Sequence, residues 1–197
     1  EGFVDGEDSG VYRVAPLSRL NVADSMSTPL AQEAMEKMFE TLGGKPAHNT
    51  LAFHWARLIE ALNAAERMVE LLDDPEITST DVRNLPTETP SEGVGVVEAP
   101  RGTLIHHYRT DDQGIITMAN LIVATNHNAA PMCMSVEKAA KGMVHGPDVT
   151  DGMLNLVEMA FRPYDPCLAC ATHAIGKAPL VAHIYNHDRE LIRTVRK

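Results

Sequence analysis

The sequence predicts a helix-rich α+β fold with a small antiparallel sheet, and three observations support this. Apolar residues recur at helical spacing in four separate segments, whereas three β-type runs follow one another between residues 94 and 125. Of the 197 residues, 44% are hydrophobic and 22% are charged, which is the composition of a globular chain able to bury a core.

The first part of the chain is predicted to contain two helices after an irregular arm. Residues 1–27 show no sustained period, and we interpret them as a surface arm. Ser27-Thr28-Pro29 offers an N-cap and a first-turn proline to a helix that Gly43-Gly44 ends. From Asn49, one apolar face persists for about six turns, formed by Leu51, Trp55, Leu58, Ile59, Leu62, Ala65, Val69 and Leu72.

The second part alternates between strands and helices. Residues 75–93 predict a surface loop, and residues 94–97, 103–108 and 115–125 predict strands, with a hairpin turn at 111–114. Residues 134–143 and 150–161 predict helices. Residues 180–185 and 191–195 predict a second β-hairpin.

Charge and cysteine content exclude several classes of function. The 27 acidic and 17 basic residues argue against a nucleic-acid-binding surface, and no apolar run approaches the roughly 20 residues of a membrane span. Three cysteines give no disulfide framework, which favours a reducing, cytoplasmic location. The chain begins at Glu1 rather than Met, so we interpret it as part of a longer protein.

The residues with the clearest chemistry form the stretch DPCLACATH, from Asp165 to His173. Two thiols three residues apart on a turn or helix start point the same way, and helix N–H groups favour the thiolate. Such a pair suits a soft metal or redox exchange, although it also occurs as two buried cysteines without a function. A structural zinc site needs four ligands, and this stretch supplies at most three. Cys133 is expected to be a packed small hydrophobic residue.

DPCLACATH resembles the signature DPCxxCxxH near the C-terminus of nickel-iron hydrogenase large subunits. Residues 12–21, the EAPRG element at 98–102 and the hairpin at 103–128 resemble other parts of that family in the same order. The wording GVVEAPRGTLIHHY and YDPCLACATH is most similar to the cytoplasmic branch of methyl-viologen-reducing, F420-non-reducing enzymes.

The resemblance implies reversible oxidation of H2 at a nickel-iron centre whose iron carries carbon monoxide and cyanide. Cys167 would be a terminal nickel ligand, Cys170 would bridge to iron, and His173 would bind a buried magnesium ion. Arg101 and Asp165 would act beside the metals as catalytic residues. The pocket around the iron ligands would be lined by Pro100, Arg101, Leu104, Val123, Ala124 and Thr125. Electrons would pass to iron-sulfur clusters of a small subunit.

Two departures from the family pattern qualify this picture. The N-terminal CxxC of the family is absent from the sequence, so the chain resembles the C-terminal portion of a large subunit, inactive and metal-free by itself. Its partners would include the missing N-terminal half, the small subunit, and a heterodisulfide reductase, NAD or F420 module. Residues 174–197, with five basic and two acidic residues, resemble an extension that a maturation endopeptidase removes after His173. Residues 1–173 would then be the large-subunit portion.

Two alternatives remain open from the sequence. One is a non-catalytic relative of the quinone-pocket subunit of respiratory complex I, which lacks the metal and its processing. The other is a metal-binding or redox module that uses the single CxxC of Cys167 and Cys170.

Overall fold

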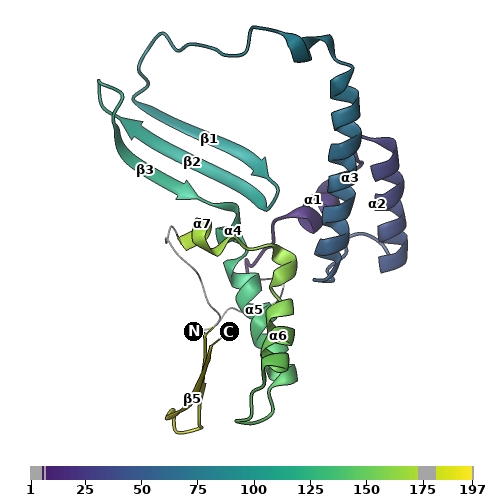
Figure 1. Ribbon diagram of the computed structural model, residues 1–197, viewed down its shortest axis with the longest axis vertical. Coiled ribbons are helices and arrows are strands. Elements are labelled where there is room, and N and C mark those ends of the chain that lie inside the picture. Colours follow the sequence, from purple (N-terminus) through teal and green to yellow (C-terminus); the bar gives the residue numbers. More distant parts are fainter. Residues whose placement is uncertain (1–5, 7, 173–180, 197) are drawn as a thin grey trace. The chain divides into compact units, whose positions relative to one another are not determined.

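A computed structural model describes residues 6, 8–172 and 181–196 of the chain. The residues group into two compact units, Val14–Ala124 and a second unit that combines Glu1–Arg13 with Thr125–Lys197 (Figure 1). Within the described residues no helix is long and apolar enough to cross a membrane. Helices and a small antiparallel sheet confirm the predicted α+β class.

Three helices form the core of the unit Val14–Ala124. They are α1 (Pro16–Val22), α2 (Pro29–Leu42) and α3 (Ala52–Leu72), and α1 and α2 both pack on α3. The prediction of a surface arm was wrong for α1, because Leu17 and Leu20 are each only 1% exposed. A seven-residue helix with two core leucines is too short to produce a detectable period.

The entry to α2 also differs from the predicted N-cap. Thr28 occupies the N-cap position, but its hydroxyl donates to Glu66 of α3 at 2.6 Å instead of capping the helix. The Glu66 carboxylate accepts the backbone N–H groups of Leu30 and Ala31 at 3.1 and 3.0 Å. A side chain from the neighbouring helix therefore satisfies the first turn of α2.

Helix α3 has two apolar faces, and the face that the sequence analysis singled out is not the buried one. Ala52, Phe53, Ala56 and Ile59 are at most 6% exposed and form the inner face. Except for Ile59, the predicted face is a separate set, which we call the outer stripe: Leu51, Trp55, Leu58, Leu62, Ala65, Val69 and Leu72. Two alanines on the inner face permit close helix packing, which the apolar count of the sequence understates.

The sheet of the same unit follows a short 3-10 turn, η1 (Pro75–Thr78), and the loop after it. Strands β1 (Glu92–Ala99), β2 (Gly102–Thr110) and β3 (Ile116–Ile122) pair antiparallel in that order. Val97 pairs with Leu104, and Tyr108 pairs with Ala119. The predicted strand to residue 125 ends earlier, because α4 (Ala124–His127) begins and the Asn128 N–H closes a turn onto the Thr125 carbonyl.

In the other unit, α5 (Ala129–Met143) begins five residues before the predicted start, with Asn128 at its N-cap. The prediction of a helix after Thr150 is confirmed by α6 (Asp151–Met159), whose Met153 N–H the Thr150 hydroxyl accepts. A 3-10 turn, η2 (Arg162–Tyr164), and the short helix α7 (Leu168–Thr172) follow.

The second β-hairpin is confirmed as β4 (Val181–Tyr185) and β5 (Leu191–Arg196). Val195 of β5 is 9% exposed and shares a small core with Val149 and Leu154. Ala182 and Ile184 of β4 pack against the same cluster. The hairpin is thus held to its unit by apolar contacts with the start of α6 and the loop before it.

Candidate metal centre

The cysteine pair lies where the backbone turns sharply before α7. Asp165 ends the 3-10 turn with φ 52° and ψ 53°, a left-handed conformation that aspartate tolerates better than most residues. Pro166 follows, and the Cys167 carbonyl then accepts the Ala171 N–H at 3.0 Å. The Cα atoms of Cys167 and Cys170 are 5.3 Å apart, and a disulfide joins their sulfur atoms. The turn therefore presents both sulfurs together, as the spacing predicts.

Helix α4 holds the cysteine turn from a neighbouring segment of the same unit. The Cys167 N–H donates to the Thr125 hydroxyl at 3.2 Å, and Thr125 is only 3% exposed. The Asn126 side-chain amide donates to the Ala171 carbonyl at 3.1 Å. Of the residues predicted to line the pocket, Thr125 is thus brought directly to the cysteine pair. Asn126 was not identified from the sequence, where a polar residue at a predicted strand end carries no signal.

Exposure distinguishes the two sulfur-bearing residues. Cys167 is half-buried beside Thr125, whereas Cys170 is exposed on α7. The segment before them is anchored by Tyr164, which is 2% exposed and shares a hydrogen bond of 3.1 Å with Ser135 of α5. A buried residue precedes an accessible cysteine, so the turn is fixed at its base and open at its tip.

The EAPRG element lies in the unit Val14–Ala124, where Pro100 and Arg101 form the turn between β1 and β2. The turn ends at Gly102, whose φ is +127°. A Cβ placed on Gly102 would lie 2.3 Å from the Val14 Cγ2 atom, so only glycine permits this close approach of the chain before α1. Leu104 is half-buried on β2, opposite Val97.

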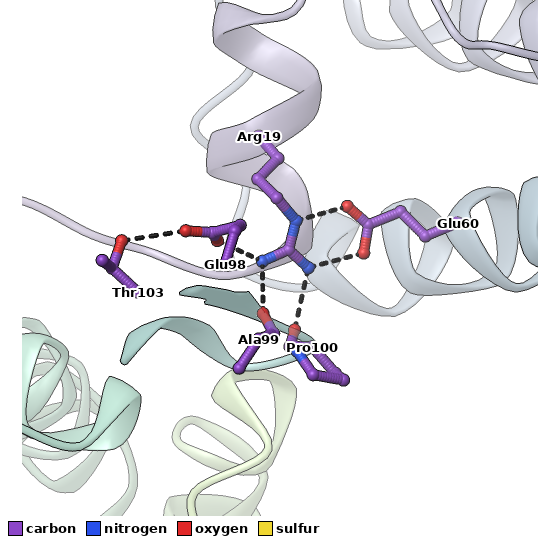
Figure 2. Close-up of polar contacts among 6 residues, drawn as sticks. All are labelled: Arg19, Glu60, Glu98, Ala99, Pro100 and Thr103. Carbon is purple, nitrogen blue, oxygen red and sulfur yellow. Dashed lines mark hydrogen bonds and ion pairs between the residues drawn. The ribbon is translucent and has the colours of Figure 1, made fainter. Parts of the chain in front are cut away.

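Arg19 of α1 holds this turn, and Figure 2 shows its contacts. Its Nε and Nη2 atoms each donate to Glu60 of α3 at 2.6 Å, and Nη1 donates to Glu98 of β1 at 2.6 Å. Nη1 and Nη2 also donate to the carbonyls of Ala99 and Pro100, at 3.0 and 2.8 Å. All five guanidinium N–H donors are therefore used.

The charge network around Arg19 is partly shielded from water. Partial burial acts to lower the pKa of Arg19, but the hydrogen bonds and charges of Glu60 and Glu98 outweigh it, and the pKa is raised. Glu98 also accepts the Thr103 hydroxyl at 2.9 Å. Sequence patterns assign Arg19 no role, because its two carboxylate partners lie 41 and 79 residues away.

The remaining predicted site residues are divided between the two units. Arg101 and Leu104 belong to Val14–Ala124, as do Val123 and the buried Ala124 at its boundary, whereas Asp165 belongs to the other unit. Catalytic cooperation of Arg101 with Asp165 therefore stays a prediction. His173, the predicted magnesium ligand, lies outside the described residues. In the described part of the chain, no three His, Cys, Asp or Glu side chains form a metal-binding group.

The prediction that Cys133 is packed was wrong. Cys133 lies on α5, where it is an exposed free cysteine. An isolated cysteine on an amphipathic helix cannot be assigned to the buried or exposed face from its residue type alone.

The cysteine turn suits a soft metal in its chemistry. Thiolates are the ligands that nickel and iron centres prefer, and both sulfurs lie together on a turn with an exposed tip. The disulfide must first be reduced, because the thiolate is the ligand. The pair supplies two sulfur ligands, so the described residues fit one half of a four-thiolate site.

The protein-family model described as nickel-dependent hydrogenase matches residues 8–173. An iron-sulfur subunit of the F420-non-reducing hydrogenase of Archaeoglobus profundus is 55% identical over 100% of this chain and 40% of its own length. The beta subunit of the NAD-reducing hydrogenase HoxS of Cupriavidus necator is 47% identical over 95% of this chain and 39% of its own length.

A solved structure agrees with these relatives. The crystal structure of an NAD+-reducing [NiFe]-hydrogenase in the H2-reduced state matches 85% of this chain with a TM-score of 0.78 and 46% identity. The match covers 37% of that protein, so this chain spans about two fifths of the length of its relatives. The chain belongs to the nickel-dependent hydrogenase family and corresponds to the C-terminal portion of its large subunit.

Proposed function

We propose that this chain is the part of a hydrogenase large subunit that contributes Cys167 and Cys170 to the nickel-iron centre. The observation that carries the proposal is the turn that presents both sulfurs together, with the Cys167 amide bonded to Thr125. The family implies a nickel-iron centre in the mature enzyme. When bound, such a centre supplies the redox-active site for reversible conversion of H2 into protons and electrons.

The residues of this chain would act around that centre in distinct ways. Reduced Cys167 and Cys170 would hold the metals, and the Thr125 hydroxyl, which accepts the Cys167 N–H, would fix the first of the two ligands. The Arg101 guanidinium would donate to cyanide nitrogen or orient the Asp165 carboxylate, within a pocket completed by Pro100, Leu104, Val123 and Ala124. The hydrogen bond from Arg19 to the Pro100 carbonyl supports this role, because it fixes the turn that carries Arg101.

The partners belong to the same proposal. They are the remaining part of the large subunit, an iron-sulfur small subunit, and a heterodisulfide reductase, NAD or F420 module. A cytoplasmic location is proposed from the branch that the sequence resembles. The relatives described above are hydrogenases, which favours this function over both an isolated CxxC module and a complex I quinone-pocket subunit.

Hydrogen-dependent reduction of methyl viologen tests the proposed activity. This chain would be produced anaerobically with the maturation machinery, a small subunit and the rest of a large subunit. We expect activity in that assembly and not in the chain alone. Cys167→Ser and Cys170→Ser should each abolish activity, while Cys133→Ser, at the exposed free cysteine, should retain it. Equal activity in all three variants would refute the assignment.

We further propose that residues 174–197 are an extension removed after His173, which would bind magnesium in the mature chain. The family match ends at residue 173, which supports a boundary there. Intact-mass spectrometry of metal-loaded, endopeptidase-treated protein should find a chain ending at His173. A mass that still includes Lys197 would contradict the proposal.

A further inference from the structure

The outer stripe of α3 has the spacing of a helix-helix interface. Its seven residues, from Leu51 to Leu72, are separated alternately by four and three positions over the length of the helix. This is the heptad pattern in which one apolar seam faces a partner helix. Trp55, Leu62 and Val69 occupy one heptad position, and Leu58 and Leu72 are among those at the other.

The stripe has no partner among the described residues of its own unit. Leu58 is 70% exposed, Val69 is 64% exposed and Leu72 is 71% exposed. The inner face of the same helix already packs on α1 and α2 through Phe53 and Ile59. Single exposed leucines are ordinary, but a continuous apolar seam along a 21-residue helix indicates an interaction surface.

We propose that the outer stripe binds an amphipathic helix from the part of the hydrogenase large subunit that lies outside the region matched by this chain. The inference rests on the proposed function. The Archaeoglobus profundus relative is aligned with the whole of this chain, yet that alignment covers only 40% of the relative. The remaining residues must pack on the aligned part, and the outer stripe offers a full helix length of unpaired apolar surface for them.

The probe for the test is the remaining part of the Archaeoglobus profundus protein, without the segment aligned to this chain. Its affinity for this chain would be measured without metal by titration calorimetry. We expect Leu58→Glu and Val69→Glu each to weaken binding at least about tenfold, because each places a charge in the seam. Ala64→Glu, on an exposed position of α3 off the stripe, should change it less than about threefold.

Thermal unfolding separates binding from folding, because substitutions at exposed stripe residues should leave the unfolding midpoint near that of the native chain. Four results would overturn the proposal. The probe fails to bind, or Ala64→Glu weakens binding as much as Val69→Glu. Alternatively, the native chain dimerises and Val69→Glu abolishes the dimer, or a cysteine at residue 58 reacts slowly in the lone Cys133→Ser chain.

Nickel uptake by the complex is a separate readout. A complex that needs the stripe but takes up no nickel through Cys167 and Cys170 would refute the proposed function and leave the docking surface intact. Nickel uptake in a complex indifferent to Leu58→Glu and Val69→Glu would do the reverse.

Discussion

At the residue scale, Arg19 connects two helices to the turn that carries Arg101. The guanidinium is planar and forks toward the Glu60 carboxylate through two N–H groups, while three further hydrogen bonds reach Glu98 and two backbone carbonyls. A lysine has the same charge but only three donors around one nitrogen, so it cannot reproduce this geometry. The charge of Arg19 is therefore less important than its shape.

Arg19→Lys should lower the free energy of unfolding by about 1–3 kcal/mol, because Glu60 and the turn carbonyls lose partners in a partly buried site. Arg67→Lys provides the control, since the Arg67–Glu70 pair is exposed on α3 and should lose less than about 0.5 kcal/mol. Urea unfolding of both variants makes the comparison. Equal losses would show that the Arg19 network adds nothing to an ordinary surface pair.

Gly102→Ala should also destabilise the unit Val14–Ala124, by roughly 1–3 kcal/mol. The new Cβ meets the Val14 side chain, and the φ of +127° is unfavourable for alanine. Gly95→Ala is the matched control on β1, where a Cβ would have no atom within 4 Å. Adding Val14→Ala should recover part of the loss in chemical denaturation, since it removes the clash but not the backbone strain.

At the element scale, α2 and α3 are coupled by a carboxylate rather than by apolar contacts alone. Desolvation acts to raise the pKa of Glu66, but hydrogen bonds from Thr28, Leu30 and Ala31 outweigh it and lower the pKa below 4.5. The folded pKa is thus depressed, so the stabilising effect is complete above the unfolded value. It is lost as pH falls through the folded value.

Glu66→Gln should therefore cost stability near pH 7, and the difference from the native chain should shrink as pH falls below about 4.5. Glu33→Gln, at an exposed position on α2, is the control and should show little dependence. Urea unfolding midpoints across this pH range give the measurement. A difference between native chain and Glu66→Gln that grows toward acid pH would contradict the cap.

Long periodic elements were predictable from the sequence, and their environments were not. The patterns that identify α2, α3 and the β1–β2–β3 sheet are local, so they survive without knowledge of the fold. Which face of α3 is buried depends on α1, a helix too short to recognise. The cysteine turn was predictable from its spacing, but the Thr125 hydroxyl contact joins residues 42 positions apart and needs the tertiary structure.

At the scale of the whole molecule, the chain presents half of a metal site and a long unpaired seam on α3. Both features have the same physical reading, because a segment that covers about two fifths of its relatives leaves ligands and apolar surface for the rest to complete. The account therefore predicts that assembly precedes function. Metal uptake should depend on reduction of the Cys167–Cys170 disulfide and on the remaining part of the large subunit.

Nickel K-edge X-ray absorption of the reduced, assembled protein tests the central claim most directly, because it counts sulfur atoms around the metal. We predict that Cys167→Ser lowers the sulfur count, or the nickel content itself, while Cys133→Ser changes neither. Nickel bound with the same sulfur count after Cys167→Ser would contradict the assignment of this turn to the metal centre.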